Sequence, residues 1–362
     1  MRFSHFYFLA SSAAILQALA APTTQASLKN AAAAVPGQSE LFASYQGKKT
    51  PLAEDWNQII HPTASGDPGP DDQLFQNLLS AEWVIYNFYQ EGVDTFTQVD
   101  FTKAGLPKNT YERLKQIRDN EAGHIRIFQD QISGTSLKPG PCTYDFGYNK
   151  SSPLEYLGLQ VYIEVTSQAF LTGLALEAVS DKSKAALMAI GQTETRHNVW
   201  GLMDTFGVSP MAGPSDTTYP YAEQILELTN SFITKCPSEN PVYPSPRQEL
   251  PQIAIWANGT TGAPGDKIQP IFYQPKNQPK FEDGKDYWAV FFHGIATVNV
   301  PYTPGQEFIT IPNQFENSTG IIIMNIADTQ DSPTAESVVA GPLVLIEQPR
   351  LLTLKAPSVV SL

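Results

Sequence analysis

Two four-residue stretches, Glu121-Ala122-Gly123-His124 and Glu194-Thr195-Arg196-His197, decide how this chain folds. Each places a carboxylate three residues before an imidazole, and residues three apart lie on the same face of an α-helix. A carboxylate and an imidazole on one face can bind the same metal ion. Two such motifs on separate helices form the core of a di-metal carboxylate site, which also needs one Glu from each of two more helices. The sequence therefore predicts a four-helix bundle around these motifs.

Two further glutamates, Glu82 and Glu164, are the candidates for the other two helices. Each precedes one Glu-x-x-His motif, so one pattern occurs twice along the chain. The residues one and two helical turns from Glu82 are apolar or aromatic, namely Phe75, Leu78, Leu79, Tyr86 and Tyr89. Such a stripe predicts that Glu82 faces the core. The neighbours of Glu164 and Glu194 are more polar, and the alternative is that these are ordinary surface glutamates.

Together these residues predict a site for two metal ions. Its expected ligands are Glu82, Glu121, His124, Glu164, Glu194 and His197. Four carboxylates carry four negative charges, which two divalent cations neutralise, and two neutral imidazoles complete the coordination. Oxygen and imidazole ligands suit iron or manganese, and they also accept zinc. Tyr86, one turn from Glu82, is a candidate hydrogen-bonding or redox partner, although core packing is the commoner role of such a tyrosine.

Start and stop signals place the helices within residues 71–235. The expected helices cover residues 71–91, 107–132, 153–179 and 181–207, with a fifth at 219–235. The third has the clearest start, with Ser152 as N-cap, Pro153 at the first helical position and Glu155 three residues after the cap. Short links join the first helix to the second and the third to the fourth, so each pair should be antiparallel.

The chain changes character after residue 235. Five prolines between residues 237 and 251 mark a linker at residues 236–251, because a helix does not tolerate them. Residues 252–362 contain short β-type runs separated by Gly, Pro and Asn, which predict a small β-sandwich-like domain. The predicted fold class is therefore α+β multidomain, a four-helix bundle plus a fifth helix followed by a β-rich domain.

The N-terminal residues are typical of a signal peptide. Arg2 precedes an apolar run that ends in Ala18-Leu19-Ala20, so we expect residues 1–20 to be removed by signal peptidase. A membrane anchor is the alternative, but polar residues interrupt a run that is already short for a bilayer. No transmembrane segment is expected in the mature chain. Residues 21–70, rich in Ala, Pro and Gly, are expected to form a low-complexity leader.

Secretion would allow two further modifications of the chain, glycosylation and a disulfide. Asn149, Asn258 and Asn317 are Asn-x-Ser/Thr sites for glycosylation. Cys142 and Cys236 can form one disulfide in an oxidising compartment, and two buried free thiols are the alternative.

The charge of the chain limits its partners. Over 362 residues, 36 acidic against 23 basic side chains give a formal net charge of −13. This charge repels polyanions, so nucleic acid is excluded as a partner. Metal ions are the partners that the glutamates favour.

Three segments carry a resemblance to a known family: residues 74–91, with Leu-Leu-Ser-Ala-Glu-Trp at 78–83, the stretch Arg118-Asp119-Asn120-Glu121-Ala122-Gly123-His124, and residues 194–200. They resemble secreted fungal proteins with a ferritin-like domain, described as stress-response or late-sexual-development proteins and similar to plant desiccation-related proteins. The resemblance implies a ferritin-like helical domain with a di-iron or related site, and the six residues named above as ligands. It covers the β-rich remainder less specifically.

The sequence leaves functions of different kinds open. One is a secreted di-iron or di-manganese protein that handles oxygen, peroxide or ferrous iron in stress or development, as a ferroxidase- or catalase-like oxidoreductase with a small oxidant substrate. The other is a non-enzymatic, stress-induced or cell-wall-associated protein, in which the bundle is a scaffold and the β domain binds a partner or polysaccharide. An iron-storage cage is a weaker third alternative, because a shell would have to accommodate the long C-terminal region.

Overall fold

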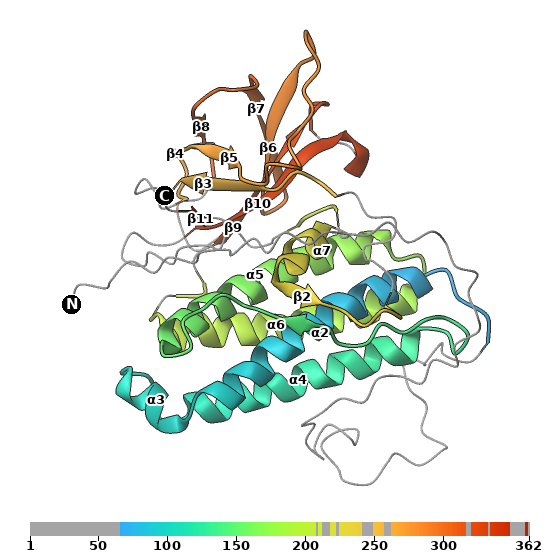
Figure 1. Cartoon of the computed structure of the whole chain (residues 1–362), viewed down its shortest axis with the longest axis vertical. Helices are drawn as coiled ribbons and strands as arrows, with labels where there is room; N and C mark the ends of the chain where they lie inside the picture. Colours follow the sequence, from blue (N-terminus) through green and yellow to red (C-terminus); the bar gives the residue numbers. More distant parts are fainter. Residues whose placement is uncertain are drawn as a thin grey trace.

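The computed structural model describes residues 66–207, 209–211, 218–221, 224–240, 249–256, 262–315, 320–331, 334–347 and 359–360. The expected signal peptide and most of the expected leader fall in residues 1–65, outside the described residues, as do Asn258 and Asn317. Figure 1 shows a layer of helices below and a group of strands above it.

Helices α2, α4, α5 and α6 form the helical region. Their bounds are Asp72–Thr95, Thr110–Gln131, Pro153–Glu177 and Asp181–Trp200. Helix α2 packs along α4, and α5 packs along α6, which are the pairs that the short connections predicted. Figure 1 shows the four helices side by side. The predicted four-helix bundle is confirmed.

Hydrogen bonds at the helix ends explain where two of these helices begin. The Ser152 hydroxyl accepts a hydrogen bond from the backbone N–H of Glu155, and a proline occupies the first turn of α5. Asp71, just before α2, accepts hydrogen bonds from the backbone N–H groups of Val179 (2.7 Å) and Ser180 (2.9 Å) at the start of α6. One carboxylate thereby joins the N-terminal ends of α2 and α6.

Two helical elements go beyond the expectation. Helix α3, Gln98–Lys103, was not expected from the sequence, and it begins with a capping box between Thr97 and Asp100. Helix α6 continues without a break into a π-helical turn, Gly201–Thr205. The chain leaves this turn at Gly207, whose φ of 63° suits glycine, so the predicted end of the fourth helix is close to the observed one.

The fifth helix is shorter than predicted. Helix α7 covers Gln224–Thr229, and a 3-10 turn, Asn230–Phe232, and strand β2, Ile233–Lys235, follow it. Strand β2 pairs in antiparallel register with β1, Thr143–Tyr144, in the connection between α4 and α5. The expectation of a helix up to residue 235 was therefore wrong, because pairing with a strand far away in the sequence overrides the local helical pattern.

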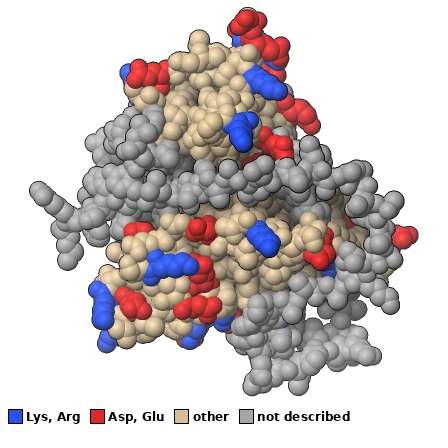
Figure 2. Space-filling model, viewed as in Figure 1, with Lys and Arg blue, Asp and Glu red and all other residues tan. Residues whose placement is uncertain are grey.

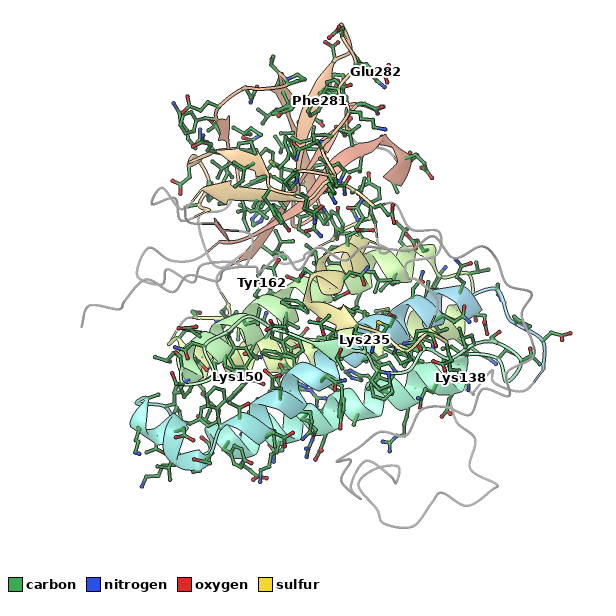
Figure 3. All side chains as sticks on the ribbon, in the orientation of Figure 1. Lys138, Lys150, Tyr162, Lys235, Phe281 and Glu282 are labelled. Atoms are coloured by element: carbon green, nitrogen blue, oxygen red, sulfur yellow. A yellow bond between two sulfur atoms is a disulfide. The ribbon has the colours of Figure 1, made fainter. Side chains whose placement is uncertain are left out.

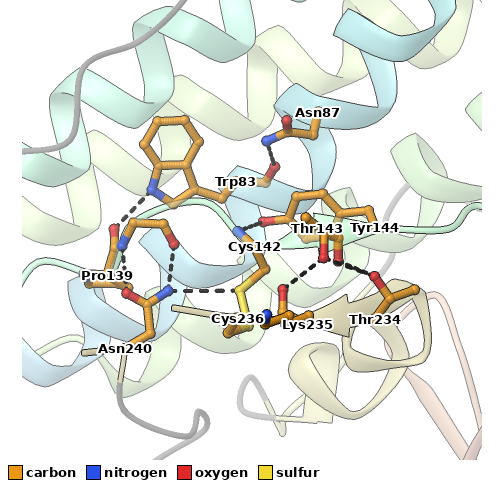
Figure 4. The surroundings of a disulfide bond; sticks show 11 residues. Trp83, Asn87, Pro139, Cys142, Thr143, Tyr144, Thr234, Lys235, Cys236 and Asn240 are labelled. Carbon is orange, nitrogen blue, oxygen red and sulfur yellow. Dashed lines mark hydrogen bonds between the residues drawn. A yellow bond between two sulfur atoms is a disulfide. The ribbon is translucent and has the colours of Figure 1, made fainter. Parts of the chain in front are cut away.

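A disulfide between Cys142 and Cys236 lies beside the β1–β2 pair (Figure 4). It links residues separated by 94 positions in the sequence. The Trp83 indole of α2 donates a hydrogen bond to the Pro139 carbonyl (2.9 Å), and Asn240 bonds to the backbone of the same connection. The Trp83 bond fastens the connection between α4 and α5 to α2, and the disulfide and Asn240 fasten it to the segment that follows β2.

The β region contains two main sheets. A four-stranded antiparallel sheet has the order β10-β9-β6-β7, and a three-stranded sheet has the order β11-β3-β5, in which β11 runs parallel to β3. A further pair joins β4 and β8. The bounds are β3 Ile253–Trp256, β4 Lys267–Ile268, β5 Pro270–Phe272, β6 Tyr287–His293, β7 Ala296–Tyr302, β8 Ile309–Thr310, β9 Gly320–Ala327, β10 Val338–Glu347 and β11 Val359–Val360.

The two sheets share one apolar core. In it, Ile255 of β3 packs in the same cluster as Phe291 of β6 and Met324 of β9. This arrangement agrees with the expected small β-sandwich-like domain and, together with the bundle, with the predicted α+β class.

A second apolar core joins the two regions. It includes Tyr162 of α5 and Leu226 of α7 on the helical side, and Phe292 of β6 and Ile321 of β9 on the β side. Figure 3 shows Tyr162 on the side of the helices that faces the β region, whereas Phe281 lies farther up among the strands. The β region is therefore packed onto α5 and α7.

Candidate metal centre

All six expected ligands lie in the interior of the helical bundle. The contributing helices and residues are α2 with Glu82, α4 with Glu121 and His124, α5 with Glu164, and α6 with Glu194 and His197. Each of the six is at most 5% exposed. The structure thus brings together every residue that the sequence analysis proposed as a ligand, and it buries the polar-flanked glutamates of α5 and α6 as completely as the others.

The six side chains form two overlapping clusters. The His124 cluster contains Glu82, Glu121, His124 and Glu194, and the His197 cluster contains Glu121, Glu164, Glu194 and His197. Within each cluster, one ligand atom from every residue lies within 4.8 Å of the others. The glutamates of the two Glu-x-x-His motifs belong to both clusters.

These two shared carboxylates each turn one oxygen toward each imidazole. Glu121 Oε2 lies 3.0 Å from His124 Nδ1, and Glu121 Oε1 lies 2.9 Å from His197 Nδ1. Glu194 Oε1 lies 3.3 Å from His124 Nδ1, and Glu194 Oε2 lies 3.7 Å from His197 Nδ1. Two carboxylates that face two imidazoles in this way have the arrangement of bridging ligands between two metal ions.

The other two glutamates lie at opposite ends of this arrangement. Glu82 Oε1 is 3.1 Å from His124 Nδ1, and Glu164 Oε2 is 3.5 Å from His197 Nδ1. Each therefore suits a terminal ligand for one ion. The complete donor set, two terminal carboxylates, two bridging carboxylates and two imidazoles, fits two divalent cations whose charges balance the four glutamates.

Four buried polar atoms at this centre have no hydrogen-bond partner among the described residues. They are Glu121 Oε1, Glu164 Oε2, Glu194 Oε2 and His197 Nδ1. The 2.9 Å approach of Glu121 Oε1 to His197 Nδ1 lacks the direction of a hydrogen bond, so it satisfies neither atom. Buried polar atoms of this kind are rare in folded proteins and require an explanation, of which a bound ion is one. A cation among these atoms would satisfy all four, so the residues present fit a metal.

Burial and the neighbouring charges together shift the pKa values of the four glutamates in different directions. Desolvation raises the pKa of Glu82 and of Glu164 well above the usual range. Desolvation acts on Glu194 as well, but the two imidazoles, 3.3 and 3.7 Å from its oxygens, outweigh it and hold the pKa well below the usual range. The pKa of Glu121 is also lowered, because the attraction of the two imidazoles outweighs desolvation and the repulsion of Glu194.

Both imidazoles have pKa values well above the usual range of histidine. Desolvation would lower the pKa of His124 and of His197, but the surrounding carboxylates outweigh it and favour the protonated form. Without metal, Glu82, Glu164 and both imidazoles therefore keep their protons to higher pH than free side chains do. Metal binding would therefore have to displace protons.

Neighbouring side chains hold the ligands on the His197 side. Asn120 Oδ1 lies 3.1 Å from His197 Nε2, which leaves His197 Nδ1 to face the carboxylates. Gln160 Nε2 donates to the His197 carbonyl (3.3 Å), and the Tyr89 hydroxyl donates to Glu164 Oε1. Contacts of this kind fix the tautomer and the orientation of metal ligands.

The hydrogen bond from a tyrosine to an expected ligand comes from Tyr89, whereas the sequence analysis pointed to Tyr86. The Tyr86 ring packs edge-on against Trp83, with centroids 6.0 Å apart, and its hydroxyl lies 3.5 Å from Gln90 Oε1. Tyr89 is buried, and desolvation raises its pKa well above the usual range. Its signal in the sequence was its place two turns after Glu82 in the same stripe. A redox role for Tyr86 stays a prediction.

The other expected sites lie outside the bundle interior. Asn149 is exposed in the connection between α4 and α5, where its Oδ1 accepts hydrogen bonds from the backbone and hydroxyl of Ser151. Cys142 and Cys236 are joined as a disulfide. Across the described ranges, no helix combines the length and the apolar character needed to cross a membrane. Acidic and basic side chains are interspersed on the face of the helical region seen in Figure 2.

These observations define a helical bundle with a carboxylate- and imidazole-rich interior, and comparison with known proteins agrees with them. Residues 70–201 match the family model of the ferritin-like domain, which covers all six expected ligands. The protein Rds1 of Schizosaccharomyces pombe is 23% identical over 170 residues, which are 47% of this chain and 41% of Rds1. The chain therefore spans about two fifths of the length of that curated relative. The helical region contains a ferritin-like domain, and the two comparisons support similarity to a fungal ferritin-like family.

Proposed function

We propose that the ferritin-like domain holds two iron or manganese ions and handles oxygen, peroxide or ferrous iron. The observation that carries this proposal is the pair of shared carboxylates, Glu121 and Glu194, each of which turns one oxygen toward each imidazole. A single Glu-x-x-His pair is common on helix surfaces, whereas two buried pairs that face each other and leave four buried polar atoms without a partner among the described residues fit a cation between them.

The protein's own residues bind the ions, orient the ligands and exclude water. The six ligands would hold two ions, with Glu82 and Glu164 at the ends. The fully buried Tyr89 of α2, which bonds to Glu164 and has its ring 6.5 Å from the ring of His197, helps to keep bulk water out of the centre. When bound, two redox-active ions would supply or accept the electrons that oxygen and peroxide chemistry needs.

Two reactions fit this donor set. In a ferroxidase reaction, O2 takes two electrons from two Fe(II) ions and two protons from solvent, and yields H2O2 and two Fe(III) ions. In a catalase-like reaction, two H2O2 molecules yield O2 and two H2O molecules without an external reductant. Hard oxygen ligands with two imidazoles serve iron and manganese alike, so an assay has to decide between the two reactions.

We further propose that the protein is secreted and acts in stress or development. The N-terminal pattern of residues 1–20, the disulfide and the exposed sequon at Asn149 support an oxidising secretory route. The resemblance to secreted fungal stress-response proteins supports the same setting.

Elemental analysis of the mature protein tests the metal proposal directly. Protein secreted from metal-replete medium should contain close to two equivalents of iron or manganese, and the double variant Glu121→Ala, Glu194→Ala should contain none. Asn87→Ala, which alters a half-buried residue of α2 that bonds to the Trp83 carbonyl, serves as the control and should keep the metal. Oxygen uptake with Fe(II) and peroxide decay with Mn(II) then identify the reaction. Wild-type protein without stoichiometric metal would refute the proposal.

A further inference from the structure

The two clusters differ in how their polar atoms are satisfied. In the His124 cluster, His124 Nδ1 is hydrogen-bonded to Glu82 Oε1 (3.1 Å) and to Glu121 Oε2 (3.0 Å). The hydrogen bonds of this imidazole therefore already occupy the ligand atoms of its own cluster. An ion that binds there must first break these hydrogen bonds.

The His197 cluster has the opposite character. All four of its residues contribute one buried atom without a hydrogen-bond partner among the described residues, namely Glu121 Oε1, Glu164 Oε2, Glu194 Oε2 and His197 Nδ1. These four atoms are donors of the types that a divalent cation binds, and they converge on one position. An ion that enters there breaks no hydrogen bond of these atoms and satisfies every one of them.

Residues that are not themselves ligands also hold the side chains of the His197 cluster in place. Asn120 bonds to Nε2 of His197, Gln160 bonds to the carbonyl of His197, and Tyr89 donates to the far oxygen of Glu164. Preorganised ligands lose little conformational freedom when they bind an ion, so support of this kind raises affinity. The hydrogen bonds described for the His124 imidazole, in contrast, are made to other ligands of the centre.

We infer that the two metal positions fill in order, the His197 position first and tightly, and the His124 position second and more weakly. This inference rests on the proposed di-metal function and assigns different tasks to the two ions. The ion at His197 is resident. The position at His124 is where a divalent ion, such as a ferrous substrate ion, enters and leaves.

Titration of the chelated, full mature protein with Mn(II) tests this order. We expect two binding events in calorimetry, with the first about tenfold or more tighter than the second. Electron paramagnetic resonance should show isolated Mn(II) up to one equivalent and spin-coupled pairs only beyond it. Coupled pairs from the first addition, or two events of equal affinity, would overturn the inference while leaving the di-metal centre intact. Absence of Mn(II) and Fe(II) binding would instead overturn the proposed function itself.

Variants assign the events to positions. His124→Ala should keep the tight event and lose the weak one, whereas His197→Ala should lose the tight one, and the reverse pattern would overturn the inference. Asn120→Ala should weaken the tight event about 10- to 100-fold through loss of ligand orientation. Asn87→Ala is its matched control, because Asn87 is also a half-buried helical asparagine with a single described hydrogen bond, and it should leave both events unchanged. Circular dichroism identifies any variant that fails to fold, and the wild-type titration decides the order without any variant.

Discussion

The helical region and the β region both have apolar cores, but they differ in the charged groups that these cores contain. The helical core buries four carboxylates and two imidazoles at one point, whereas the core shared by the two sheets is formed by side chains such as Ile255, Phe291 and Met324. Burial of apolar surface stabilises a fold whatever the pH or the metal concentration, but buried charge stabilises it only when a counter-charge is present. The stability of the helical region should therefore depend on metal and pH, and that of the β region should not.

Chelation of the metal gives the largest expected effect on this comparison. At ion concentrations near a thousand times Kd, each bound ion adds about 4 kcal/mol to the free energy of unfolding. Thermal melts with and without a chelator should therefore differ strongly for the wild-type protein. The variant Glu121→Ala, Glu194→Ala should melt at one temperature in both conditions, because its bridging ligands are gone. A wild-type melting temperature that does not change with the chelator would contradict this expectation.

The pH dependence should separate the loaded and chelated forms further. In the chelated fold, the pKa of Glu82 and of Glu164 is raised above the ordinary 4.5, and the pKa of both imidazoles above the ordinary 6.5. The unfolded chain therefore releases these protons at lower pH than the fold does. The two carboxyls contribute less to the stability of the chelated fold as the pH rises above 4.5. The two imidazoles contribute less as the pH rises from 6.5 through their raised pKa values.

Metal binding has the opposite sign, because ions and protons compete for the same atoms. The difference in unfolding free energy between loaded and chelated protein should grow by about 1.4 kcal/mol per pH unit for each proton displaced. Melts at several pH values between about 5 and 8 measure this growth. A constant difference over that range would show that binding displaces no protons.

Local spacing was enough to find the ligands, but not the residues that hold them. The six ligands follow from two Glu-x-x-His motifs and from the apolar stripe around Glu82, which are properties of single helices. Asn120 and Tyr89 act on ligands of other helices, α6 and α5. Which side chain reaches across depends on the rotation of one helix against another, and the spacing within a helix does not encode that rotation.

The same distinction explains the errors in the fold. The long helices carry their own start signals, such as the Ser152 cap, so their order and pairing could be predicted. Strand β2 has three residues and exists through its pairing with β1, which local periodicity does not reveal. The strands β4, β5 and β11, of two or three residues each, likewise depend on pairing with distant segments.

A large-to-small substitution in the β core tests whether the stability of the β region is independent of metal. Phe291 is fully buried between strands, so Phe291→Ala should lower the free energy of unfolding by about 3–5 kcal/mol through the cavity it leaves. The loss should be the same with and without chelator, and the metal content per folded protein should not change. Phe308→Ala is the control, since Phe308 is 41% exposed and should change the stability by less than about 0.5 kcal/mol. A loss that depends on metal would show that the two cores are coupled.

The smallest expected effect on stability comes from Asp71, a carboxylate of the helical region whose hydrogen bonds do not depend on metal. Burial alone would raise the pKa of Asp71, but hydrogen bonds from Ser183 and from the backbone of Val179 and Ser180 outweigh it and lower the pKa. Asp71→Ala should therefore lower the free energy of unfolding by about 1–2 kcal/mol, with Asp67→Ala at an exposed position as the control.

The pH dependence of this effect distinguishes the two kinds of buried carboxylate. Because the pKa of Asp71 is lowered, its contribution is present above the ordinary 3.8 and is lost as the pH falls through the lowered value. The contributions of Glu82 and Glu164 in the chelated protein have the opposite sign and grow as the pH falls through their raised pKa values. Chemical denaturation of wild type and Asp71→Ala at neutral and acidic pH, with and without chelator, measures both. A loss that vanishes on chelation would mean that Asp71 acts through the metal centre. A loss that persists would mean that backbone N–H groups satisfy this carboxylate in the way that ions are proposed to satisfy the four glutamates.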